Sequence, residues 1–202
     1  MSKNYIIPKG FHYSNFIPWF KCIKGSFEIE RTIVFTDSCE YEIDEPSCVN
    51  KLFGFCFGMF GVHKNSARFG WTYDKGRGTI KLWRYVYENG KLEKVVIEDV
   101  HIGEPITLKL YVEQIKPVNI TKWRFDKDTN DIVETDNSIH TNYCVNFVVN
   151  NHTICYWYIP TDIKYIVTLG PYFGGKRRAP HCIRIIENNS HIKMYNNNAL
   201  GL

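Results

Sequence analysis

Residues 51–87 read KLFGFCFGMFGVHKNSARFGWTYDKGRGTIKLWRYVY and carry the clearest repeating pattern of the chain. Large apolar residues alternate with glycine or cysteine from Phe53 to Met59, and a second alternating run extends from Ala67 to Tyr73. A period of two is typical of a β-strand with one apolar face. The glycine-containing loop 74–78 leads into a third alternating run, which predicts three antiparallel strands joined by hairpins.

Runs of the same kind lie on both sides of this block. They are residues 27–35, 92–100, 106–115, 143–149, 153–159, 164–169 and 180–186. No dozen residues keep the apolar spacing of a helix. The many short strands predict an all-β fold in which two antiparallel sheets pack as a jelly-roll sandwich. The proline-containing residues 5–20 are expected to be extended at a sheet edge.

The chain of 202 residues is expected to form a single sandwich domain over residues 1–187. Between about residues 116 and 140 the alternation gives way to Asp, Asn, Thr and Lys, which predicts a long irregular loop. Residues 188–202 contain three consecutive asparagines and are interpreted as a polar C-terminal tail.

Charge and cysteine content restrict the partners and the compartment. The formal net charge is +4, and the basic residues are scattered except for Lys176, Arg177 and Arg178, so a nucleic acid partner is not favoured. This basic cluster is instead interpreted as a loop tip that contacts a protein partner. Seven cysteines without a C-x-x-C pair indicate reduced thiols in a protein assembled in a cytosol. No apolar run predicts a secretion signal or a membrane anchor.

Five segments in order, IPKGFHYS, NKLFGFCFG, HKNSARFGWTYD, IKLWRYVYENGK and LGPYFGGKRRAPHCIRI, give the chain a resemblance to known proteins. Over residues 5–187 it resembles the concanavalin A-like lectin and glucanase sandwiches. More narrowly, it is similar to small members encoded by Bacteroidetes and by their crAss-like tailed phages. The resemblance implies one concave sheet, which lectins and polysaccharide-cleaving enzymes use to hold glycans and which other members use only to assemble.

The catalytic motifs of the enzymes in this superfamily are missing. There is no E-x-D-x-x-E strand to supply the two carboxylates of a glycosidase. The residues from Tyr172 to Gly175 faintly resemble the YFKAG-like strand of alginate lyases, but the R-x-E-L-R and Q-I-H signatures that accompany it are absent. General acid–base catalysis needs its groups within hydrogen-bonding reach of one another. No catalytic residue is therefore predicted.

Single residues remain as candidates for a ligand groove. They are His63, Arg68, Tyr85, Trp157, Tyr172 and His181. For each of them a structural role is the alternative. His63 and Arg68 would form an ion pair with Asp74 or contact backbone carbonyls. Tyr85 and Trp157 would pack in the core, and Tyr172 and His181 would anchor the turn at Gly174 and Gly175. The seven histidines are dispersed, so neither a metal site nor another cofactor is predicted.

The functional prediction is a non-enzymatic structural or accessory protein of a tailed-phage virion, in the head or the portal and tail region. It is expected to assemble in the bacterial host cytoplasm, to contact other virion proteins through its loops, and to form a homo-oligomer that covers its sheet edges. The alternative is a carbohydrate-binding module, or less favoured, a polysaccharide lyase or hydrolase. The structural protein is preferred because glycines that could form a groove are present, whereas no set of residues for acid–base catalysis or for metal binding is found.

Overall fold

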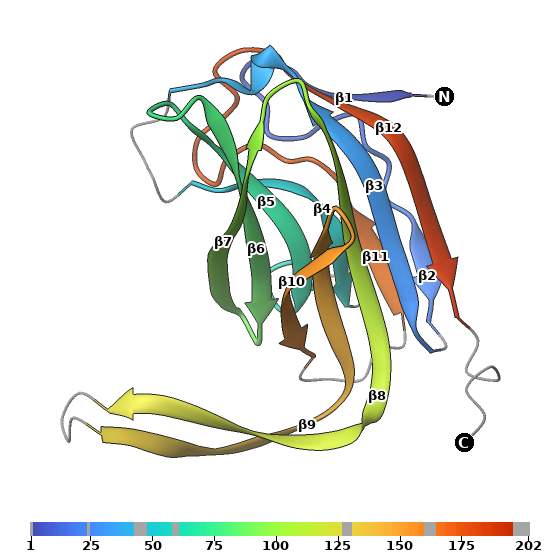
Figure 1. The fold of residues 1–202 in the computed structure, drawn as a ribbon, viewed down its shortest axis with the longest axis vertical. Helices are drawn as coiled ribbons and strands as arrows, with labels where there is room; N and C mark the ends of the chain where they lie inside the picture. Colours follow the sequence, from blue (N-terminus) through green and yellow to red (C-terminus); the bar gives the residue numbers. More distant parts are fainter. Residues whose placement is uncertain are drawn as a thin grey trace.

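The computed structural model describes residues 2–23, 25–42, 48–57, 61–126, 131–159 and 165–195, with residues 116–142 described by their backbone alone. The chain forms two six-stranded sheets that face each other (Figure 1). Sheet A contains, in spatial order, β1 (Lys3–Ile7), β12 (Ile183–Met194), β3 (Phe27–Phe35), β8 (Pro105–Asp126), β9 (Asp131–Val149) and β10 (His152–Tyr158). Sheet B contains β2 (Phe20–Cys22), β11 (Tyr165–Leu169), β4 (Asn50–Phe57), β5 (Ser66–Asp74), β6 (Thr79–Glu88) and β7 (Lys91–His101).

The predicted all-β jelly-roll sandwich is thus confirmed. Neighbouring strands within the two sheets are antiparallel. β1 lies at the edge of sheet A and contains only the start of the segment 5–20 that was expected at an edge, because Pro8 and Pro18 lie outside the strands. A short 3-10 helix, η1 (Asp37–Cys39), follows β3. No helix in the described part of the chain is long and apolar enough to cross a bilayer.

Aromatic side chains fill the space between the sheets. Among the described residues, several pairs of rings bridge it, and in three of these pairs, with centroid distances of 5.3 Å, 5.4 Å and 5.3 Å, all rings are almost completely buried. These three pairs are Phe27 with Phe55, Phe35 with Trp71, and Phe147 with Phe69. Because side chains alternate along a strand, these inward-facing rings turn the residues between them toward the outer faces of the sheets.

A β-bulge in β4 changes this alternation. The pairing of β4 with β5 shifts between Lys51 and Gly54, and the two residues in between, Leu52 and Phe53, are both buried. Two residues of β4 therefore face a single residue of β5. Since the extra residue shifts the period of two, Lys51 lies on the same outer face of sheet B as Gly54, not on the inner face with Phe53.

The segment from residue 116 to residue 140 is not the predicted irregular loop. β8 continues to Asp126 and β9 begins at Asp131, and the two strands pair with each other as they bend away from the sandwich (Figure 1). Residues 127–130 lie outside the described residues. The prediction was wrong because a two-stranded ribbon gains its backbone hydrogen bonds locally and needs no apolar face when it lies outside a core.

The predicted polar tail also begins too early. β12 runs to Met194. It pairs with β3 from Ile185 to Met194, and the register shifts once, between Glu187 and Asn189. The shift is a β-bulge that restores pairing beyond the apolar part of the strand. Residues 196–202 lie outside the described residues.

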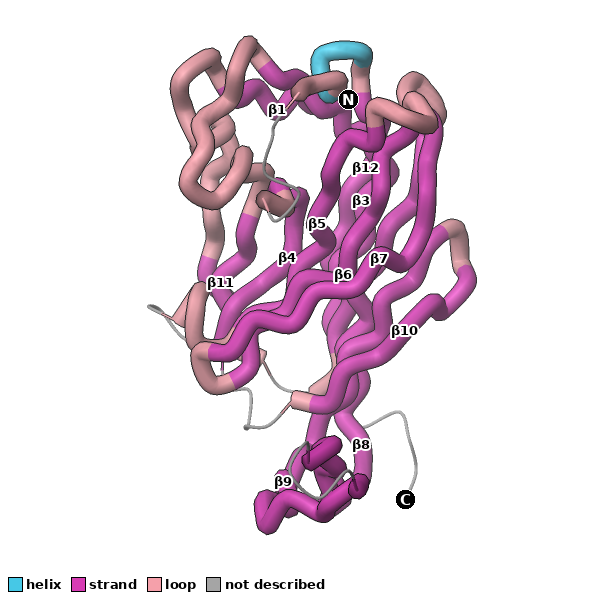
Figure 2. Tube along the Cα trace, turned by 90° about the vertical axis from the view of Figure 1, so that its left-hand side faces the viewer, coloured by secondary structure: helices cyan, strands magenta, loops and turns pink. Residues whose placement is uncertain are grey.

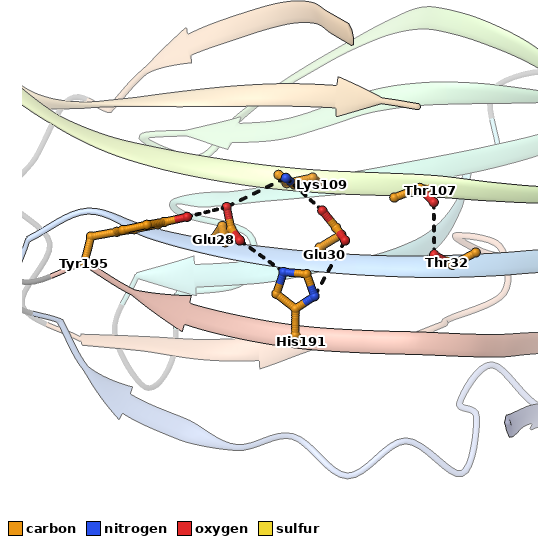
Figure 3. A network of polar contacts seen from close by, with 7 residues as sticks. All are labelled: Glu28, Glu30, Thr32, Thr107, Lys109, His191 and Tyr195. Atoms are coloured by element: carbon orange, nitrogen blue, oxygen red, sulfur yellow. Dashed lines mark hydrogen bonds and ion pairs between the residues drawn. The ribbon is translucent and has the colours of Figure 1, made fainter. Parts of the chain in front are cut away.

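Polar side chains on the outer face of sheet A fasten this last part of β12 (Figure 3). The two ring nitrogens of His191 lie 3.0 Å and 3.6 Å from carboxylate oxygens of Glu28 and Glu30, and the hydroxyl of Tyr195 donates a hydrogen bond of 2.8 Å to Glu28. The ammonium of Lys109 on β8 lies 2.8 Å from Glu30. Burial raises the pKa of Glu28, but the hydrogen bonds from Tyr195 and His191 and the charge of Lys109 outweigh it and lower the pKa below its ordinary value. These contacts join β12, β3 and β8.

A substitution at Gly54 would show how closely β4 and β5 approach each other. A Cβ atom at this position would lie 2.1 Å from the carbonyl oxygen of Ala67. Gly54→Ala should therefore lower the free energy of unfolding by about 1–3 kcal/mol, as overpacking does elsewhere. Gly76→Ala is the control, because the nearest atom to its new Cβ is Asp74 Oδ1 at 3.4 Å. Urea unfolding of both variants measures the difference, and equal stabilities would contradict the close approach.

Candidate functional site

A hollow of about 640 Å³ lies on the outer face of sheet B, and we call it the sheet B hollow. Its floor comes from β4, β5 and β6, which lie side by side in Figure 2, and its wall from the segments at residues 13–18 and 169–175. The polar and aromatic side chains in its lining are Tyr13, Ser14, Phe16, Lys51, His63, Arg68, Tyr85, Tyr87 and Tyr172. The hollow therefore combines tyrosine rings with two strongly basic groups.

Backbone pairing aligns part of this lining in a row across the sheet. Tyr13 is bridged to Tyr172, Tyr172 to Lys51, and Lys51 is paired with Gly70, which in turn is paired with Trp83. Paired residues of antiparallel strands point to the same face. The row thus presents two phenol rings and an ammonium group to the hollow. At Gly70 the side chain of Val49 fills the space, since a Cβ atom there would lie 2.6 Å from Val49 Cγ1, and Trp83 lies beyond the lining.

Arg68 is a buried cation whose hydrogen-bonding capacity is not used up. Its exposed fraction is 5%, and its Nε and Nη2 atoms have no hydrogen-bond partner among the described residues. The guanidinium carbon lies 5.3 Å from the ring centre of Tyr85. Burial lowers the pKa of Arg68, although an arginine still keeps its proton. Buried donors without partners are costly, so an acceptor that enters the hollow would be bound strongly.

The expected ion pair between Arg68 and Asp74 does not form. Asp74 pairs instead with the ammonium of Lys81 at 2.6 Å. No carboxylate of the described residues lies within 4.0 Å of the Arg68 guanidinium. Asp74 lies at the far end of the same strand, β5, and roughly 20 Å of extended chain separates it from Arg68.

Lys51 is a second buried cation beside Arg68. Its ammonium donates a hydrogen bond of 2.9 Å to the carbonyl oxygen of Gly174 and lies 5.0 Å and 5.6 Å from the ring centres of Tyr85 and Tyr172. Burial, assisted by the positive charge of Arg68, lowers the pKa of Lys51 to about 8. The described residues place no carboxylate in an ion pair with it. The two positive charges therefore repel each other in a region of low polarity, and an anion would relieve this repulsion.

The turn that carries Tyr172 is fixed by its backbone. Gly174 has a φ of +67°, and a Cβ atom there would lie 2.1 Å from the carbonyl oxygen of Arg177, so the turn requires glycine. The N–H of Gly174 donates a hydrogen bond of 2.6 Å to Oδ1 of Asn50, a fully buried residue of β4. This anchor also holds the carbonyl oxygen that accepts from Lys51.

Four of the predicted groove residues come together, and two do not. Those in the sheet B hollow are His63, Arg68, Tyr85 and Tyr172. Trp157 instead lies buried between the sheets, where its Nε1 donates a hydrogen bond of 3.1 Å to Glu88. The ring of His181 lies outside the hollow and its Nε2 is 2.8 Å from the carbonyl oxygen of Ser38, a structural contact. The exposed residues Lys176, Arg177 and Arg178 lie beyond Gly175, and their contact with a partner remains a prediction.

Lys51 and Tyr13 were missed by the sequence analysis. Simple alternation places Lys51 on the inner face with Phe53, and only the bulge reverses this. Two adjacent large apolar residues, Leu52 and Phe53, followed by a glycine in an otherwise alternating strand are a usable sign of such a bulge. Tyr13 carries no such sign, because it reaches the hollow through bridges between segments far apart in the sequence. Among the described residues, no group of three or more His, Cys, Asp and Glu side chains is arranged to hold a metal ion.

Comparison with known proteins shows the fold. No family model and no curated protein sequence matches the chain. Among solved structures, the alginate lyase vAL-1 from a Chlorella virus is similar at a TM-score of 0.59, with 11% identity over 95% of this chain and 84% of that one. A family 18 polysaccharide lyase gives a TM-score of 0.51, with 9% identity over 97% and 88% of the two chains. Sheep galectin-11 gives 0.44, with 14% identity over 88% and 96%. The chain has the concanavalin A-like sandwich fold that the resemblance implied.

These comparisons correct the functional prediction. A non-enzymatic structural protein of a phage particle was predicted, but the two solved structures that are similar at TM-scores of 0.59 and 0.51 are both polysaccharide lyases. They favour the alternative, a protein that acts on glycans, over the main prediction. The prediction failed because it inferred function from missing motifs, whereas the lining of the sheet B hollow is built from residues distant in the sequence. The phage origin, the virion location and the homo-oligomer remain predictions.

The lowered pKa of Lys51 predicts how stability changes with pH. Below a pH of about 8 the buried ammonium is charged in the folded protein and destabilises it. Between this pH and about 10.4, the ordinary lysine pKa, only the unfolded chain holds the proton, so the wild type gains stability as the pH rises. The stability of the wild type relative to Lys51→Met should therefore increase by about 1–2 kcal/mol between about pH 7 and about pH 9.5 in urea unfolding. The same comparison with Lys176→Met, at an exposed site, should show no such trend.

Proposed function

We propose that the protein binds an acidic polysaccharide in the sheet B hollow, with Arg68 and Lys51 holding an acidic group of the sugar. The observation that carries this proposal is the pair of buried cations for which the described residues provide no carboxylate. A planar guanidinium with free N–H groups matches a carboxylate in geometry and charge. Burial strengthens such a contact, because less water screens it.

The tyrosines suit the sugar part of the same ligand. Tyr85, Tyr87 and Tyr172 line the hollow that contains the cations. Aromatic rings pack against the apolar C–H faces of sugars, and phenol hydroxyls exchange hydrogen bonds with sugar hydroxyls. A small inorganic anion would use the cations alone, so the composition of the hollow favours a sugar acid over a simple anion.

Cleavage of the bound polysaccharide by a lyase reaction is a second candidate. The two solved structures that share the fold at TM-scores of 0.59 and 0.51 are both polysaccharide lyases. In such a reaction the cations would neutralise the uronate carboxylate while another group removes the neighbouring proton. Burial raises the pKa of Tyr85 and of Tyr172, so these phenols keep their protons and are better suited to donate one than to remove one. We therefore place binding before cleavage.

Replacing either cation should weaken binding of acidic polysaccharides. Arg68→Met and Lys51→Met should each reduce the affinity for oligomers of a uronic acid by about tenfold or more, because each removes a charge-assisted hydrogen bond from a site of low polarity. Isothermal titration calorimetry with uronic acid oligomers measures the loss. Lys176→Met changes the net charge by the same amount at an exposed position and should keep the wild-type affinity.

Two results would contradict the proposed function. One is a wild-type protein that binds no uronic acid oligomer, and the other is an equal loss of affinity in Lys176→Met, which would indicate attraction by net charge alone. Urea unfolding checks that the variants are folded. Removal of a buried cation without a partner is expected to leave the fold at least as stable as before.

Cleavage has its own signature. A lyase would release unsaturated uronate, which absorbs ultraviolet light, and Tyr172→Phe should abolish the release while binding is retained, because the ring stays and only the proton donor is lost. Lack of any product from the wild type on oligomers that it binds would exclude the lyase and leave the binding function. Product formation that persists in Tyr172→Phe would exclude Tyr172 as the proton donor.

A further inference from the structure

Tyr13 is an exposed aromatic residue at the mouth of the sheet B hollow. Its exposed fraction is 73%, and its side chain contributes to the lining. The ring makes a T-shaped contact with Tyr172 at a centroid distance of 5.0 Å, and Tyr172 also stacks with His12 at 5.1 Å. Most of the Tyr13 ring therefore remains accessible to a ligand that already touches Tyr172.

The backbone beside Tyr13 is held in place on both sides. Before Tyr13, the N–H of Phe173 donates to the carbonyl oxygen of His12 at 2.8 Å, and after it, the N–H of Ser14 donates to the carbonyl oxygen of Pro171 at 3.4 Å. A ring on such a segment is already oriented before a ligand arrives. Preorganised aromatic side chains contribute to affinity at a low cost in conformational entropy.

The position of Tyr13 fits a ligand longer than one sugar. Tyr13 is bridged to Tyr172 and Tyr172 to Lys51, so Tyr13 lies two strand positions from the cation. Neighbouring strands are about 4.8 Å apart, which gives a separation of roughly 10 Å along the row. A sugar held by its acidic group at Lys51 and Arg68 would extend along this row, and a following unit of the same chain would reach Tyr13.

The same segment carries other exposed apolar residues, and their position relative to the hollow indicates whether Tyr13 contacts a sugar or a protein partner. Phe11, Ile17 and Phe20 are 60%, 81% and 51% exposed, but none of them contributes to the lining of the hollow. Tyr13 alone among these four shares the hollow with the cations, and it alone carries a hydroxyl group. Because Tyr13 lines the same hollow as Lys51 and Arg68, we expect it to contact the polysaccharide and not a protein partner.

We infer that Tyr13 is a sugar-stacking subsite of the sheet B hollow, separate from the site of the acidic group, so that the protein binds oligomers better than single sugars. This inference rests on the proposed function. It makes Tyr13 a residue that determines the preferred length of the ligand, and it assigns no catalytic role to it.

The test is the affinity of Tyr13 variants for uronic acid oligomers of increasing length, from one to five or so units. Tyr13→Ala should lose about three- to tenfold in affinity for the longest oligomers and nothing for the single sugar acid. Tyr13→Phe should keep most of the affinity, because the ring remains. Phe11→Ala is the matched control, since it removes an exposed ring from the same segment outside the hollow, and it should bind every oligomer like the wild type.

The outcomes separate this inference from the proposed function. A wild type that binds no oligomer overturns both. If the wild type binds but Tyr13→Ala loses nothing on long oligomers, or loses equally on the single sugar, the subsite is wrong and the proposed function stands. A loss in Phe11→Ala as large as that in Tyr13→Ala would assign the effect to the whole apolar segment, as in a protein-docking surface, and would also overturn the subsite. Urea unfolding confirms that each variant is folded.

Discussion

The contact between the two inward-facing layers of aromatic rings is the constraint on which the rest of this protein depends. Phe69 contacts Phe147 and Trp71 contacts Phe35 across the core. These large rings fix which side of β5 faces the core. Since neighbouring residues of a strand point to opposite sides, burying Phe69 places Arg68 on the outer face. The cation of the sheet B hollow is therefore positioned by apolar packing on the other side of the same strand, and the accuracy of that packing is transmitted to the site.

The hollow itself is built at the expense of stability. Two cations in a region of low polarity, without a carboxylate from the described residues, oppose folding, and the surrounding core must compensate for them. Proteins keep such local conflicts mainly at functional sites. The contrast with Arg31 is instructive: this buried guanidinium lies 2.9 Å from the carboxylate of Glu187 and accordingly has a structural explanation. Arg68 and Lys51 have no such carboxylate among the described residues, and this difference is what the proposed anionic ligand would account for.

Sequence reasoning predicted the fold and most of the strands because the alternation of residues 51–87 is strong and local. It placed Arg68 and Tyr85 on one face for the same reason. It missed Lys51 because a bulge changes the period, and it included Trp157 because a periodic pattern does not tell which face of a strand is buried. The extension of β8 and β9 was missed because backbone pairing needs no apolar alternation, and the end of β12 was missed because polar side chains, not apolar ones, join it to β3. The hollow needed three-dimensional information, since its wall comes from both ends of the chain.

β7 forms the last strand of sheet B, and in the described part of the chain no further strand pairs with its outer side. Its pairing with β6 shifts between Leu82 and Trp83, which marks a bulge, and charged residues recur along it from Lys91 to Asp99. A kinked, charged border is a poor template for a foreign strand, whereas a flat apolar one invites endless stacking. The bulge and the charges of β7 thus protect this sandwich, whose sheets have edge strands, against fibril growth. A closed barrel has no edge strand and needs no such protection.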